Sequence, residues 1–109
     1  MVMPGGRKFR IIYDREVKNH LAAIDPRHYS LIRRAIEDQL TGQPDMETRN
    51  RKPLRRPSAF GTAWELRFGP DNRFRVFYAI EVTTGQVNVL AIGEKSGSVL
   101  RIGGEEFDL

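Results

Sequence analysis

The chain of 109 residues contains no cysteine, and this absence excludes several kinds of chemistry together. Disulfides, zinc sites built from thiolates and cysteine nucleophiles are all ruled out, and the composition fits a reducing cytoplasm. Histidine is nearly absent too. His20 and His28 are the two histidines, and we expect both to be surface side chains rather than metal ligands. The sequence therefore predicts a protein with no metal and no other cofactor.

Long apolar segments are also missing. No stretch approaches the roughly 18 apolar residues of a membrane span, and residues 1–6 contain no apolar run of signal-peptide length. We therefore expect a cytoplasmic protein with no membrane contact. The hydrophobic content of 39% is typical of a globular chain. A chain of this length predicts one domain, residues 1–109, with a modest core.

Positive charge is present, and it is unevenly distributed. The formal net charge is +4, and five of the eight residues from 49 to 56 are basic. Three of the last five residues, by contrast, are acidic. Such polarity favours a polyanion or an acidic protein as partner on one side of the molecule, although a short basic run can also be a solvated loop.

Apolar spacing predicts a strand followed by a helical hairpin. Residues 8–13 alternate in polarity, as strands do. Two stripes at helical spacing follow, divided by Asp25 and Pro26, which are suited to begin a helix because Asp accepts from unpaired amides and Pro lacks an amide hydrogen. Gly42 and Pro44 end the second helix. The stripes are Val17, Leu21 and Ile24, then Leu31, Ile32, Ala35, Ile36 and Leu40.

The second half of the chain predicts a meander of strands behind an irregular basic segment, residues 45–62. Residues 63–68 and 73–80 are joined by a turn sequence, and strands at 86–92 and 99–102 follow. Alternation assigns one face to Trp64, Leu66, Phe68, Phe74, Val76, Tyr78 and Ile80. The opposite face receives Glu65, Arg67, Arg73, Arg75 and Phe77. We expect helices to cover the apolar face and leave the other face polar and cationic.

Four segments, in this order, resemble the RelE/ParE superfamily of bacterial toxins: residues 51–54 (RKPL), 64–67 (WELR), 74–78 (FRVFY) and 89–95 (VLAIGEK). The resemblance implies an α+β, RelE-like fold, in which an N-terminal strand and a helical hairpin pack on one face of an antiparallel sheet of about four strands. It also implies the toxin of a type II toxin–antitoxin module. Such a toxin is an mRNA interferase, a ribosome-dependent endoribonuclease that inhibits translation and is held inactive by an antitoxin encoded beside it.

The resemblance also implies which residues bear the chemistry. Arg67, Arg75 and Lys95 match basic positions of the family, and a planar guanidinium suits the charge of the pentacovalent phosphorus. RelE-type toxins usually carry a tyrosine or histidine late in the chain, and residues 96–100 contain neither. Glu65 is the nearest substitute as general base, unless it forms an ion pair with Arg73 or Arg75. We expect RNA contacts from Arg49, Arg51, Lys52, Arg55, Arg56 and Arg73.

Two other functions remain open at this point. A ParE-like toxin would bind DNA gyrase and need no nuclease chemistry, as the missing tyrosine or histidine suggests. A non-toxic remnant would only bind an antitoxin-like partner. Residues 103–106 have no chemical assignment, and we consider them a docking tail whose acids lie over the basic face.

Overall fold

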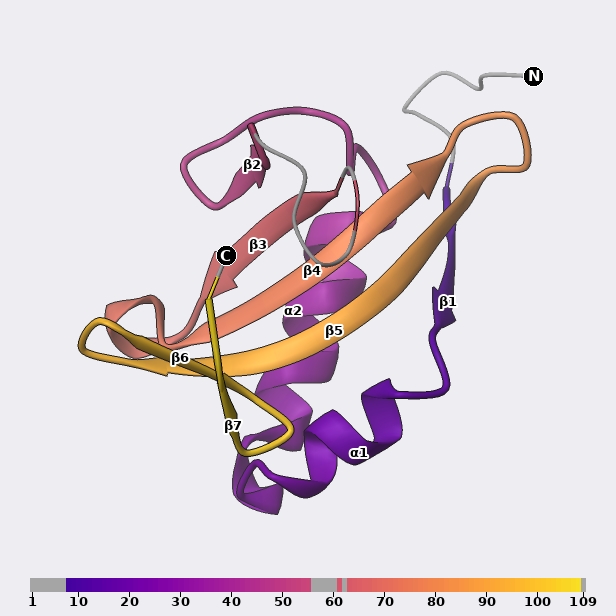
Figure 1. Ribbon diagram of the computed structural model, residues 1–109. Helices are drawn as coiled ribbons and strands as arrows, with labels where there is room; N and C mark the ends of the chain where they lie inside the picture. The colour runs from indigo at the N-terminus through magenta and orange to yellow at the C-terminus, as the bar shows by residue number, and fades with distance from the viewer. Residues whose placement is uncertain (1–7, 56–60, 62, 109) are drawn as a thin grey trace.

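The computed structural model describes residues 8–55, 61 and 63–108, and within them one sheet is backed by helices on one face (Figure 1). The strands are β1 (Arg10–Tyr13), β2 (Arg51–Pro53), β3 (Trp64–Phe68), β4 (Phe74–Glu81), β5 (Gln86–Ser96), β6 (Val99–Ile102) and β7 (Glu105–Phe107). The helices are α1 (Val17–Ala22) and α2 (Tyr29–Leu40), with 3-10 turns η1 (Pro26–His28) and η2 (Pro70–Asn72).

The predicted α+β fold class is confirmed, and the sheet is larger than expected. The described strands number seven, in the order β2-β3-β4-β5-β6-β7, with β1 paired to β5 outside this path. Two short strands, β2 and β7, lie in segments for which no strand was expected. Pairing is antiparallel throughout except between β1 and β5, which are parallel.

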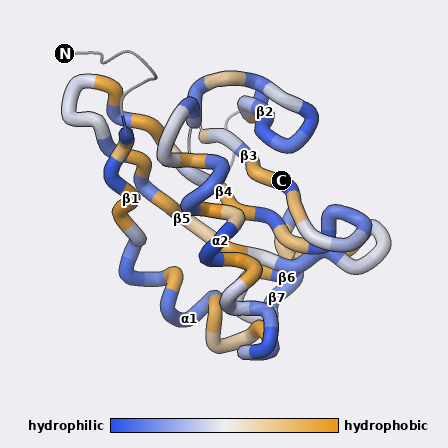
Figure 2. Tube along the Cα trace, turned by 180° about the vertical axis from the view of Figure 1, so that it is seen from behind, coloured by the Kyte–Doolittle hydropathy of each residue, from blue (hydrophilic) through white to orange (hydrophobic). Residues whose placement is uncertain are grey.

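The main core lies between the helices and the sheet. At the start of η1 the Asp25 side chain accepts from the backbone amide of Arg27 at 3.0 Å, as the sequence indicated. The predicted apolar face of β3 and β4 is confirmed, since Leu66, Phe74, Val76 and Tyr78 pack with the helices. Figure 2 shows hydrophobic residues (orange) along β4 and β5, with hydrophilic residues (blue) among them. Burying each such side chain contributes roughly 1.5–3 kcal/mol, so this face determines how the hairpin docks.

The opposite face of the sheet differs from the polar surface that we expected. Phe77 and Ala91 are fully buried there in a second cluster with Leu100 and Ile102, and Leu54 and Phe107 pack against it. The C-terminal strands therefore cover part of this face. Gly93 makes this possible, because a Cβ at that position would lie 2.7 Å from the Arg101 carbonyl oxygen. Only the remaining part of the face is left for charged side chains.

In the part of the chain that the structure describes, no helix is long and apolar enough to cross a membrane.

Candidate functional site

The turn before β4 interrupts the alternation of side chains. Asp71 and Asn72 have φ angles of 55° and 53°, a left-handed conformation that Asp and Asn tolerate better than most residues. Arg73 follows in helical conformation. Its guanidinium therefore lies beside Glu94, with Nε–Oε2 at 2.6 Å. We had expected Arg73 on the same face as Arg75. That expectation was wrong because strict alternation begins only after the turn.

Arg75 is held by a buried carboxylate. Its Nη1 donates to Glu65 Oε2 at 3.1 Å, and its Nε donates to the backbone oxygen of Asn72 at 3.1 Å. The other oxygen of Glu65 accepts from Arg67 Nε at 2.8 Å. Glu65 is 3% exposed and Arg75 is 8% exposed. Both carboxylate oxygens are thus engaged, and the ion-pair alternative for Glu65 is the geometry found.

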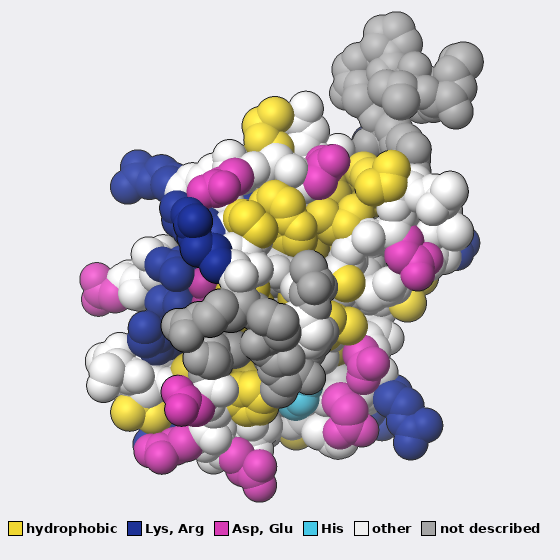
Figure 3. All heavy atoms as spheres, turned by 45° about the horizontal axis from the view of Figure 1, so that its top comes forward, with side chains coloured by type: hydrophobic (Ala, Val, Ile, Leu, Met, Phe, Trp, Pro, Cys, Tyr) yellow, Lys and Arg dark blue, Asp and Glu magenta, His cyan; other side chains and the backbone are white. Residues whose placement is uncertain are grey.

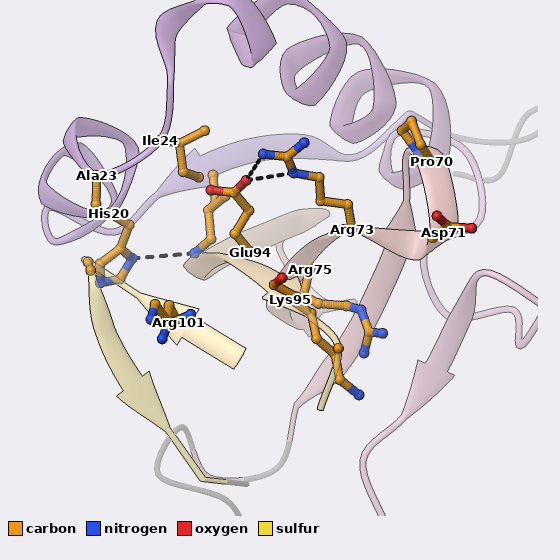
Figure 4. A pocket seen from close by; sticks show the side chains of 15 residues that line it. His20, Ala23, Ile24, Pro70, Asp71, Arg73, Arg75, Glu94, Lys95 and Arg101 are labelled. Atoms are coloured by element: carbon orange, nitrogen blue, oxygen red, sulfur yellow. Dashed lines mark hydrogen bonds and ion pairs between the residues drawn. The ribbon is translucent and has the colours of Figure 1, made fainter. Parts of the chain in front are cut away.

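A pocket of about 580 Å³ opens at this end of the sheet (Figure 4). We call it the cationic pocket. Its lining includes four cationic side chains, two carboxylates and a histidine: Arg73, Arg75, Lys95, Arg101, Asp71, Glu94 and His20. They come from α1, η2 and three strands, and Figure 4 shows Arg75 and Lys95 projecting together, away from the Arg73–Glu94 pair. The volume is within the range of small-molecule and cofactor sites.

The residues that we expected to be catalytic separate into two groups. Arg75 and Lys95 line the cationic pocket, whereas Arg67 and Glu65 do not. Arg67 is connected to the pocket through Glu65, which pairs with both arginines. One carboxylate therefore holds two guanidinium groups at defined positions, a preorganised arrangement that suits binding of an anion.

The described part of the basic segment, residues 45–55, which we call the basic loop, does not line the cationic pocket. Arg51 is 9% exposed, and its guanidinium donates to the carbonyl oxygens of Gln39 and Met46 at 2.8 and 3.0 Å. It is therefore used inside the protein, and we no longer include it among RNA contacts. Lys52 is half-buried, 3.8 Å from a Glu47 carboxylate oxygen, and Arg49 and Arg55 are exposed. Arg56 lies outside the described residues. Figure 3 shows lysines and arginines in a band along one side of the molecule.

His20 and Arg101 are site residues that the sequence did not reveal. The Nδ1 atom of His20 accepts from the backbone amide of Ile92 at 3.3 Å. Burial lowers the pKa of His20, partly opposed by Glu16 and Asp14. We had expected a surface side chain. No local pattern connects His20 to β5, because 72 positions separate it from Ile92.

The C-terminal segment forms part of the sheet. β7 pairs with β6, and Glu106 lies 3.6 Å from the Arg101 guanidinium. Gly103 and Gly104 line the cationic pocket. The predicted docking tail is therefore an edge strand, and one of its acids is paired with a pocket arginine.

A second hollow, of about 680 Å³, lies between the end of β1 and the two helices. We call it the apolar groove. Tyr13, Val17, Leu21, Tyr29, Ile32 and Ile36 line it. The charged lining residues are Arg15, Lys18, Arg33 and Asp14, so the net charge of the rim is positive. Burial raises the pKa of Tyr13, and Glu37 adds to the effect. The groove combines an apolar floor with a basic rim, unlike the cationic pocket.

Comparison with known proteins supports the fold. No family model matches the chain, and no curated protein matches it. Among solved structures, the chain is similar to the toxin–antitoxin complex RelBE2 from Mycobacterium tuberculosis, with a TM-score of 0.65 and 20% sequence identity. The match covers 84% of this chain and 95% of that chain. The chain thus has a fold found in a RelBE complex, in agreement with the fold predicted from its sequence.

Proposed function

We propose that this chain is the toxin of a type II toxin–antitoxin module and that it cleaves messenger RNA on the ribosome. The fold supports the assignment to the class. The observation that carries the nuclease assignment is Arg75, fixed by Glu65 and the Asn72 carbonyl at the wall of the cationic pocket. A guanidinium held in this way can stabilise charge without reorganising.

The proposed reaction needs few groups. The 2′-hydroxyl loses its proton and attacks the adjacent phosphorus, and the 5′-oxygen leaves with a proton. Arg75 and Lys95 would stabilise the charge that develops on the phosphoryl oxygens, since both line the pocket. Arg67 would act through Glu65. Arg49, Lys52 and Arg55 would contact RNA phosphates outside the pocket, because sequence-independent phosphate contacts need only accessible cations. We keep Arg56, from the same basic run of the sequence, as a fourth proposed RNA contact.

The apolar groove supports a protein partner for the same module. Its apolar floor and three cationic side chains suit an amphipathic segment with acidic residues along its edges. We assign this groove to the cognate antitoxin. The antitoxin would then bind at a site other than the cationic pocket.

Induction of the chain without a partner tests the function. We expect growth to stop because translation stops, and primer extension on cellular messages to show new 5′ ends inside reading frames. Pulse labelling should show protein synthesis falling before DNA synthesis. The opposite order, with intact messages, would contradict the nuclease proposal.

One observation favours the second candidate, a ParE-like inhibitor of DNA gyrase. Glu65 is 3% exposed, both of its oxygens accept from arginines, and it does not line the cationic pocket, so it is poorly placed to take a proton from a substrate. A gyrase inhibitor needs no general base. Supercoiling by purified gyrase in the presence of the chain distinguishes the two functions, because an mRNA interferase should leave supercoiling unchanged.

A further inference from the structure

His20 is held in one orientation at the wall of the cationic pocket. The ring belongs to α1, and its Nδ1 accepts the amide hydrogen of Ile92 in β5. Gly103 closes the other side, since a Cβ there would lie 3.6 Å from the Cδ2 atom of His20. Figure 4 shows His20 at one end of the lining and Pro70 and Asp71 at the other, with Arg75 and Lys95 between them. The helix and the sheet thus fix the imidazole before any ligand arrives.

The contact with Ile92 determines the tautomer. An Nδ1 atom that accepts a hydrogen bond bears no proton, so the neutral ring has its proton on Nε2. Protonation of Nδ1 would place its N–H group against the N–H group of Ile92, and the hydrogen bond would be lost. No described residue forms a hydrogen bond with Nε2. Every buried side-chain nitrogen or oxygen atom of the described residues has a hydrogen-bond partner, so Nε2 is not one of the buried atoms. The Nε2–H group is therefore an accessible donor.

Burial favours the neutral form of the ring, against the nearest charges. Asp14 and Glu16, from the segment that leads into α1, favour protonation, and burial outweighs them. The charged groups outside α1 that line the same pocket are Asp71, Arg73, Arg75, Glu94, Lys95 and Arg101. Glu94 is paired with Arg73, and Arg101 faces Glu106. The lining holds four cationic side chains and two carboxylates, so its net charge is positive.

We propose that His20 contacts the ligand of the cationic pocket as a neutral hydrogen-bond donor, through Nε2–H, to a phosphate oxygen of single-stranded RNA. The choice of RNA rests on the proposed function. Arg75 and Lys95 supply charge, which attracts any polyanion. His20 supplies a single donor at a fixed position, and this would set where along the backbone a phosphodiester is bound.

Three variants separate this role from a structural one. His20→Asn places an amide oxygen near the position of Nδ1, so it can still accept from Ile92 but loses the donor at Nε2. His20→Gln reaches the position of Nε2 with an amide donor. His28→Asn is the matched control, because His28 packs on the Phe74 ring at 5.1 Å and does not line the pocket. Melting temperatures identify any variant that fails to fold.

The measurement is binding of a short RNA with a 2′-deoxy substitution that prevents cleavage. We expect His20→Asn to bind roughly tenfold or more weakly, as for a lost hydrogen bond to a charged group, with His20→Gln and His28→Asn close to wild type. Nitrogen NMR of the free protein at neutral pH should show the His20 proton on Nε2, and its signal should shift on RNA addition. A proton on Nδ1, or wild-type binding by folded His20→Asn, would overturn the proposal.

The pH dependence of RNA binding gives a second test. A neutral donor predicts constant RNA affinity from about pH 6.5 to 8, where an imidazolium would lose its charge. Affinity that falls over this range in wild type and not in His20→Asn overturns the proposal. His20-dependent binding without cleavage of ribosome-bound message supports it while contradicting the nuclease function. Cleavage that requires Arg75 and is unchanged in His20→Asn contradicts the role of His20 alone.

Discussion

At the scale of single residues, the site depends on how a few charged groups are held. Arg75 is positioned from two sides, by a carboxylate and by a backbone oxygen, and it lines the cationic pocket. Lys95 lines the pocket without a described ion-pair partner among residues 8–55, 61 and 63–108. The guanidinium of Arg75 supplies a fixed fork of donors, whereas the ammonium of Lys95 supplies a charge at the end of a flexible side chain. Their loss should therefore have different consequences.

Replacing Arg75 with alanine should reduce cleavage of a programmed ribosome complex by about a hundredfold to a thousandfold, the cost of losing one preorganised donor in a transition state. Ribosome affinity should change far less, because the other cations remain. Single-turnover cleavage is the measurement, and Arg34→Ala, on the exposed face of α2, is the control. Full cleavage by a folded Arg75→Ala protein would remove Arg75 from the proposed active site.

Replacing Glu65 with glutamine tests anchoring against proton transfer. The buried carboxylate compensates two guanidiniums, and removing one partner of a buried pair typically costs several kcal/mol. We expect the melting temperature to fall by roughly ten degrees or more. Calorimetry and cleavage should be measured together. An unchanged melting temperature with abolished cleavage would instead identify Glu65 as the general base.

At the scale of elements, one side chain of β2 connects the basic loop to the end of α2. Arg51 in β2 donates to carbonyl oxygens of Gln39, near the end of α2, and of Met46 in the loop. Carbonyls in the last turn of a helix lack internal partners and favour a cation. Arg51 thus holds the loop against the helix, and its neighbours Arg49, Lys52 and Arg55 remain at or near the surface.

Replacing Arg49, Lys52, Arg55 and Arg56 together should weaken RNA binding and reduce its salt dependence. For single strands each lost phosphate contact lowers the slope of log affinity against log salt by roughly 0.7. Binding should be titrated at several salt concentrations. Arg51→Ala is the contrasting variant, which should lower the melting temperature because carbonyl partners are lost. A salt slope unchanged by the fourfold substitution would assign the loop to another partner.

At the scale of the whole molecule, β5 connects the separate parts. Its first residues pair with β1 and its last residues with β6, while β4 runs along its other side. Ile92, within this strand, also bonds to His20 of α1. The helical layer and the pocket are therefore joined at one strand, and the protonation of His20 affects the stability of the fold.

The stability of the protein should fall as the pH decreases below about 6.5, the ordinary pKa of histidine. The pKa of His20 is lowered in the folded state, so the unfolded chain binds the proton more readily. The contribution of the neutral ring is present above the unfolded pKa and is lost as the pH falls through the folded pKa. Urea unfolding of wild type and His20→Asn should show their difference narrowing over this range. A difference that grows on acidification would contradict the lowered pKa.

Much of the fold followed from the sequence alone, because local patterns report local geometry. Alternation placed Leu66 and Val76 towards the helices and Arg75 on the opposite face, and Asp25 marked the start of a helical segment, as observed. The resemblance to RelE/ParE toxins predicted the fold that the structural comparison supports. The period of a strand depends only on its own backbone, so a sequence window is sufficient.

The composition of the site was decided by the tertiary structure. Two left-handed residues redirected Arg73, packing of α2 against the loop buried Arg51, and the C-terminal strands covered Phe77. His20 entered the cationic pocket through a contact across most of the chain. A sequence window specifies which face a side chain occupies, but the group that it meets depends on how distant elements pack. Packing is a property of the whole core, and for this reason the sequence predicted the face on which Arg75 lies and did not predict that His20 lines the pocket.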